Sequence, residues 1–128
     1  MADKYLDTTL ASGLNDGTSI ANAWQDMREV MTNTQAAGTY AAGDVINVRS
    51  HDGTTDITED LGATTLAQAE IGSEQLPVTW LIDDGTVWPQ GGIFTMQHGG
   101  DTALRVISAT FSDGKFGNYR NLYLVCQF

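Results

Sequence analysis

The segment Asp16–Met31, DGTSIANAWQDMREVM, decides how the rest of the chain is interpreted, because it predicts a helix in a chain otherwise rich in strand and turn signals. Ser19 is a suitable N-cap. Large apolar residues recur at helical spacing and share one face: Ile20, Trp24, Met27 and Met31. Polar residues between them are expected to face water: Gln25, Asp26, Arg28 and Glu29. We therefore expect one helix that starts near Ile20, ends before Gly38 and covers the first strands with its apolar face.

Short strand patterns separated by turn residues fill the rest of the chain. The predicted strands are Lys4–Thr8, Val45–Arg49, Val78–Ile82, Ile93–Gln97, Ala103–Phe111 and Asn121–Phe128. Four Asp-Gly pairs mark turns, at positions 16–17, 52–53, 84–85 and 113–114. The acidic stretch from about 50 to 76 predicts a strand near Ile57, a helical turn at Leu66–Ile71 and an excursion over the surface.

These patterns predict a single, mainly β domain over residues 1–128. Residues 1–44 would hold a strand and the capping helix, and residues 45–128 the β body.

Composition excludes several classes of function. With 6 Lys and Arg against 16 Asp and Glu, the net charge is −10, which disfavours nucleic acid as a partner. No apolar run is long enough to span a membrane, and the start, MADKYLDTTL, carries no secretory signal. The single cysteine, Cys126, excludes an internal disulfide and a multi-cysteine metal site, and we expect it to be a buried apolar residue.

The order of motifs in the first 50 residues resembles a known family. A strand with Tyr5-Leu6-Asp7 is followed by Leu14–Ser19, by Ala21-Asn22-Ala23-Trp24 and its helix, and by Ala42–Arg49, AGDVINVR. This order resembles the start of right-handed parallel β-helix proteins of the pectate-lyase-like superfamily, which includes polysaccharide lyases, surface adhesins and phage tailspikes. The resemblance implies that the helix caps the open end of the β-helix and that Ala42-Gly43-Asp44 begins the first rung. A weaker likeness continues through Leu76–Trp80.

The chain departs from the enzymes of that family. It has room for about three or four rungs, too few for a long saccharide groove, taking roughly 20 to 30 residues per repeat. The calcium-binding carboxylates and the basic residue of the lyases do not map onto it. The fold expectation is therefore a short or incomplete right-handed parallel β-helix with one N-terminal capping helix, and the alternative is a small β-sandwich with one helix.

Residues with catalytic or metal-binding chemistry are better explained as surface and turn residues. Asp83, Asp84 and Asp101 lie beside glycines and fit turn chemistry better than a calcium loop. Acid pairs of Asp56 with Glu59 or Asp60 fit a solvated acidic face, and His51 and His98 stand next to turns. We expect no catalytic residue, no cofactor and no bound metal.

Four aromatic residues are candidates for a protein interface. Trp80 lies in an apolar strand and is assigned to the core, whereas Trp88 precedes Pro-Gln-Gly-Gly and is expected to be an exposed anchor. The others lie near the C-terminus: Tyr119, Tyr123 and Phe128. An apolar terminal strand there needs a partner, either within the chain or on another subunit.

Together these features predict a non-enzymatic structural protein of a bacteriophage virion, made in the host cytoplasm. The first expectation is a capsid decoration (cement) protein that contacts itself or other virion proteins, and the next is a tail or fibre component. The alternative from another class is a carbohydrate-binding module or adhesin fragment that binds glycan through Trp88.

Overall fold

The computed structural model describes residues 1–60, 66–67, 69, 71, 75–99, 107–108, 117–120 and 122–127. The described part is mainly β, with one short α-helix, α1 (Met27–Thr32), and one 3₁₀ turn, η1 (Ile20–Asn22). The strands are β1 (Asp3–Leu6), β2 (Val45–Val48), β3 (Thr58–Asp60), β4 (Leu66–Ala67), β5 (Val78–Ile82), β6 (Phe94–Gly99), β7 (Ile107–Ser108), β8 (Gly117–Arg120) and β9 (Leu122–Gln127).

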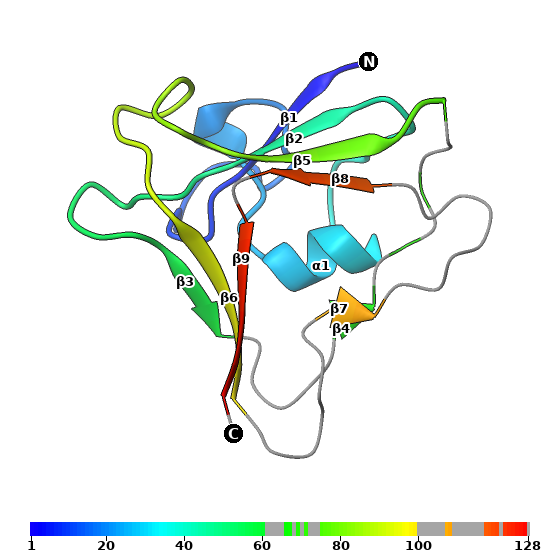
Figure 1. Ribbon diagram of the computed structural model, residues 1–128. Coiled ribbons are helices and arrows are strands. Elements are labelled where there is room, and N and C mark those ends of the chain that lie inside the picture. The colour runs from blue at the N-terminus through cyan, green and yellow to red at the C-terminus, as the bar shows by residue number, and fades with distance from the viewer. Residues whose placement is uncertain are drawn as a thin grey trace.

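Every pairing between these strands is parallel. One sheet has the order β1-β2-β5-β8, a second the order β3-β6-β9, and β4 pairs with β7. The chain thus visits the three sheets in turn, through β2, β3 and β4, then β5, β6 and β7, then β8 and β9. Figure 1 shows the three sheets arranged around α1, with the first along the top and the second down the left. All-parallel pairing argues against the small β-sandwich, whose sheets are antiparallel.

The core lies between α1 and the inner faces of the sheets. In β5 the pattern alternates, with Val78, Trp80 and Ile82 buried, because successive side chains point to opposite faces. Register places Leu6, Val48 and Ile82 side by side, and all three are buried. The ring of Tyr40 meets Trp24 and Trp80 edge-on, with centroids 5.9 and 6.0 Å apart. This aromatic row ties the N-terminal segment to the first sheet.

The segment before α1 closes the outer edge of β1. The Tyr5 N–H donates to the carbonyl of Gly17, the Trp24 N–H donates to the Tyr5 carbonyl, and the Asp7 N–H donates to the Trp24 carbonyl. The other side of β1 pairs with β2. Both sides of this first strand are therefore hydrogen-bonded, which removes the exposed backbone that an edge strand presents.

The prediction of one continuous helix is wrong. Ser19 is an N-cap, but of η1, where its hydroxyl accepts from the Asn22 N–H. Trp24 is extended and bridges to Leu6, because its backbone pairs with β1. The α-helix starts only after Asp26, whose carboxylate accepts from the Glu29 N–H.

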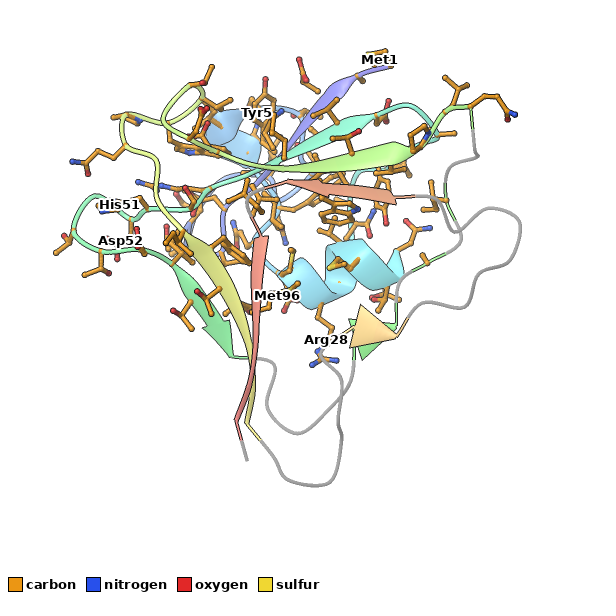
Figure 2. All side chains as sticks on the ribbon, in the orientation of Figure 1. Met1, Tyr5, Arg28, His51, Asp52 and Met96 are labelled. Carbon is orange, nitrogen blue, oxygen red and sulfur yellow. The ribbon has the colours of Figure 1, made fainter. Side chains whose placement is uncertain are left out.

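The helix ends at Asn33, which adopts the left-handed conformation, well before Gly38. The predicted burial of Trp24, Met27 and Met31 is confirmed, whereas Ile20 is 43% exposed. Figure 2 shows Arg28 extending from α1 toward the side where β4 and β7 lie.

The strand predictions are confirmed where apolar alternation is strong. Val78–Ile82 matches β5 in full, and Val45–Arg49 matches β2 to within one residue. The helical turn predicted at Leu66–Ile71 is wrong at its start, because Leu66–Ala67 is a strand paired with β7. β8 was not expected, since Gly117–Arg120 lacks an apolar alternation. The predicted strand Ala103–Phe111 falls on described residues only at 107–108.

We predict that Trp24→Ala lowers the free energy of unfolding by roughly 3 to 5 kcal/mol. The side chain is fully buried, and its Nε1 donates to the Ala37 carbonyl at 2.8 Å. Urea denaturation of both variants measures the effect, with Ile20→Ala as the exposed control expected to change by less than about 0.5 kcal/mol. Equal losses in the two variants would mean that the segment does not pack as described.

Candidate functional site

Polar side chains gather where strands of the first sheet end. Asp7 and Arg49 directly follow β1 and β2, and Nη1 of Arg49 lies 2.9 Å from Oδ2 of Asp7. The Asp7 carboxylate is 2% exposed and also accepts from the N–H and hydroxyl of Thr9. Nε of Arg49 donates to the His51 carbonyl. This ion pair therefore holds together the segments that follow β1 and β2.

A second buried acid performs the same task after β5. Asp83 accepts from the N–H groups of Val87 and Trp88, at 2.8 and 3.0 Å. The hydroxyl of Ser50, itself fully buried, donates to the Asp83 carbonyl and accepts from the Gly92 N–H. Both hydrogen-bonding roles of that hydroxyl are thus occupied within the protein, as expected of a structural serine.

Asp44 provides a third example at the start of β2. Its two carboxylate oxygens accept from the N–H groups of Ala2 and Ala41. One sequence signal marks the polar residues after the strands: Asp7, Arg49 and Asp83 each directly follow a strand, and the three strands are neighbours in one sheet. Each of the three buried aspartates accepts from at least one backbone N–H group.

The expectation that Trp88 is an exposed anchor is wrong. The side chain is 4% exposed, and its ring meets Tyr5 edge-on at 6.3 Å. Asp83 folds the loop back over the sheet by holding the Val87 and Trp88 backbone, which is why a loop residue becomes buried. Tyr5 marks this outer face at the top of Figure 2.

The remaining interface candidates are placed by their backbone only or lie outside the described residues. Tyr119 stands in β8 opposite Trp80, in a row that the earlier strands fill with buried residues. Tyr123 stands in β9 opposite Thr95, which in turn pairs with the exposed Thr58. Phe128 lies outside the described residues. Both residues remain predictions as interface residues.

Other residues singled out from the sequence are dispersed. Asp84 and Asp56 are exposed, and the Asp101 position lies outside the described residues. Nδ1 of His51 accepts from the Gly53 N–H, and Figure 2 shows His51 and Asp52 on the same outer loop. His98 was expected beside a turn, but it lies within β6, in register with Cys126. Within the described residues no group of three or more His, Cys, Asp or Glu is arranged to hold a metal ion, and no pocket is present.

Three aspartates at the protein surface, the half-buried Asp16 and the exposed Asp52 and Asp84, have lowered pKa values. A hydrogen bond from the Thr18 side chain lowers the pKa of Asp16, and one from the Thr86 side chain lowers the pKa of Asp84. The pKa of Asp52 is lowered chiefly by the backbone N–H of Thr55. All three precede a glycine in an Asp-Gly turn, so these charges stabilise turns.

The two ends of the stack of strands differ. At one end the segment Gly17–Trp24 covers the outer edge of β1. At the other end β8 and β9 are the last strands in the order of their sheets among the described strands. The outermost strand of a sheet carries N–H and C=O groups that can pair with a further strand, so the β8 and β9 edges form the candidate assembly surface.

Comparisons with protein-family models, with curated proteins and with solved structures find no match. None of the described helices is long and apolar enough to cross a membrane.

We predict that Asp83→Ala destabilises the fold by roughly 2 to 4 kcal/mol, because it leaves two N–H groups at the Trp88 loop without an acceptor. An exposed aspartate in β1 supplies the control, and Asp3→Ala should change stability by less than about 0.5 kcal/mol. Urea unfolding gives the free energies. If Asp83→Ala were as harmless as the control, the loop would not depend on that carboxylate.

We also predict an acid-dependent loss of stability from Asp16, Asp52 and Asp84. A carboxyl whose pKa is lower in the folded protein binds protons more readily when unfolded, so its stabilisation is complete above the ordinary value of 3.8 and is lost as pH falls below it. Thermal unfolding between about pH 6 and about pH 2 measures this. The triple Asp→Asn variant should lose less stability over that range than the wild type, and identical pH profiles would contradict the assignment.

Proposed function

We propose that this chain forms the capped end of a right-handed parallel β-helix and serves as a structural, non-enzymatic component of a bacteriophage virion. The observation that carries the proposal is the parallel pairing of strands that enter three sheets in turn, with the β1 edge closed. Right-handedness is expected because parallel crossover connections are almost always of that hand.

The tail or fibre is the virion structure that this geometry supports best. The outer edge of β1 is closed, whereas β8 and β9 have no further neighbour among the described strands, which suits a protein extended in one direction. A capsid decoration protein, the first expectation from the sequence, attaches through its outer surface, and no feature of the described sheets favours that mode. The partner at the β8 and β9 edges would be a further parallel turn of β-structure from virion protein.

The polar groups support a structural role rather than catalysis. Four buried side chains form hydrogen bonds with backbone groups or neighbouring side chains within the fold: Asp7, Asp44, Asp83 and Ser50. The carbohydrate-binding alternative depended on an exposed Trp88, and burial of that ring removes its anchor. We therefore do not pursue glycan as the ligand.

Antibody labelling of phage particles tests the proposed function. Gold-tagged antibodies raised against this chain should decorate the tail or fibre of particles that carry its gene, viewed by negative-stain electron microscopy. Label on the capsid surface would favour decoration instead. Particles without label, together with antigen only in the soluble lysate, would overturn a virion role.

The closed β1 edge gives a second prediction, based on two glycines with positive φ. A Cβ at Gly17 (φ +72°) would lie 2.6 Å from the Trp24 ring, whereas one at Gly53 (φ +102°) would meet nothing within 4 Å. Both alanine variants carry the backbone strain of about 1 to 3 kcal/mol. Gly17→Ala should lose roughly 1 to 3 kcal/mol more, because the added methyl group overpacks the site.

Hydrogen exchange locates that loss. Gly17→Ala should speed exchange at the Tyr5 and Asp7 amides, which donate to Gly17 and Trp24, by roughly tenfold or more relative to Gly53→Ala. It should also raise the fraction of oligomers seen in size-exclusion chromatography, because the β1 edge opens. Unchanged exchange at both amides would show that this segment does not close the edge.

A further inference from the structure

Two large apolar side chains are exposed on the loop that precedes Trp24 at the β1 edge, here called the cap loop, residues 11–22. Leu14 is 69% exposed and Ile20 is 43% exposed. Ala11 and Ala21 are exposed beside them in the chain. Single exposed apolar residues are common on protein surfaces. The backbone that carries these two residues is held by hydrogen bonds within the loop.

Left-handed residues stand on both sides of Leu14. Gly13 has φ +94° and Asn15 has φ +54°, the latter uncommon outside glycine. The Leu14 N–H donates to the side-chain oxygen of Asn22, and a Cβ on Gly13 would touch the Ala21 backbone. The turn bearing Leu14 and the segment bearing Ile20 are therefore packed together, and the two side chains project from one fixed scaffold.

Charge around the cap loop is negative. From residue 5 to residue 27 the sequence has no Lys or Arg, while Asp16 and Asp26 are acidic and Asp7 is buried against Arg49. Lys4 is the nearby cation that interacts with Asp16. A second copy would bring the same acids toward the cap loop from a chain of net charge −10, so self-association through this surface is disfavoured.

We propose that the cap loop is a docking site, in which Leu14 and Ile20 insert into an apolar socket rimmed by Lys and Arg on another polypeptide. Preformed apolar anchors bind with little ordering cost, and the acids on the rim select a basic partner. This surface lies on the opposite side of β1 from β2, away from the β8 edge of the same sheet, so it adds a second contact to the proposed virion role without depending on it.

Two synthetic amphipathic peptides with the same leucine pattern serve as probes, one with Lys and one with Glu at every polar position. Titration into the isotope-labelled full chain, followed by amide chemical shifts, should show the Lys peptide perturbing residues around Leu14 and Ile20 first. The Glu peptide should bind at least about tenfold more weakly, and binding of the Lys peptide should weaken with added salt.

Matched variants make the result specific to the cap loop. Leu14→Ser with Ile20→Ser should reduce affinity for the Lys peptide by roughly tenfold or more. Leu76→Ser with Ile93→Ser, which removes apolar groups 53% and 44% exposed elsewhere, should leave affinity unchanged. Asp16→Asn, which keeps the oxygen that accepts from Thr18, should weaken binding by about two- to fivefold through loss of charge.

Several results would overturn the proposal. These are shift changes centred away from the cap loop, equal binding of the two peptides, equal losses in the two serine pairs, and no binding of the Lys peptide. Concentration-dependent dimers that disappear in Leu14→Ser with Ile20→Ser would replace the basic partner with a second copy.

Discussion

The structure depends on hydrogen bonds to the backbone along both sides of β1. A first strand has a neighbour on one side only, and here that neighbour is β2. The other side would leave the Tyr5 and Asp7 backbone without partners, and the chain solves this by returning through Gly17 and Trp24. The same return places the Trp24 ring in the core against Tyr40. One segment therefore seals an edge with its backbone and fills the interior with its side chain.

Because one edge of β1 is closed, the first sheet extends from β1 on one side only. Each later strand of the first sheet adds on the side away from the cap, in the order β2, β5 and β8. The loops between them are fixed by residues at strand ends, through the Asp7–Arg49 pair and through Asp83 with Ser50. These contacts link the segments that follow neighbouring strands of a parallel sheet, whose strands are joined by long connections.

Much of this arrangement can be predicted from apolar spacing, and the failures have physical causes. Val78–Ile82 alternates so clearly that its strand is predicted to the residue. The spacing of Trp24, Met27 and Met31 predicts their burial correctly but cannot reveal that Trp24 is extended, because its partner is the distant β1 backbone.

Trp88 shows the same limit at the candidate site. Pro and Gly after it indicate a loop, and the carboxylate of Asp83 then folds that loop onto Tyr5. Asp7 and Arg49 were missed because their pairing depends on parallel register between strands far apart in the sequence. Local sequence patterns thus define the strands, while contacts between segments far apart in the sequence define the site.

The most direct test of the account is measurement of scalar couplings across backbone hydrogen bonds in the isotope-labelled protein. We predict couplings from the Arg49 amide nitrogen to the Leu6 carbonyl carbon, from Asp83 to Val48, and from Trp24 to Tyr5. Together they would establish a parallel ladder closed at β1. Reciprocal couplings between directly opposed residues, the pattern of antiparallel pairs, would contradict it.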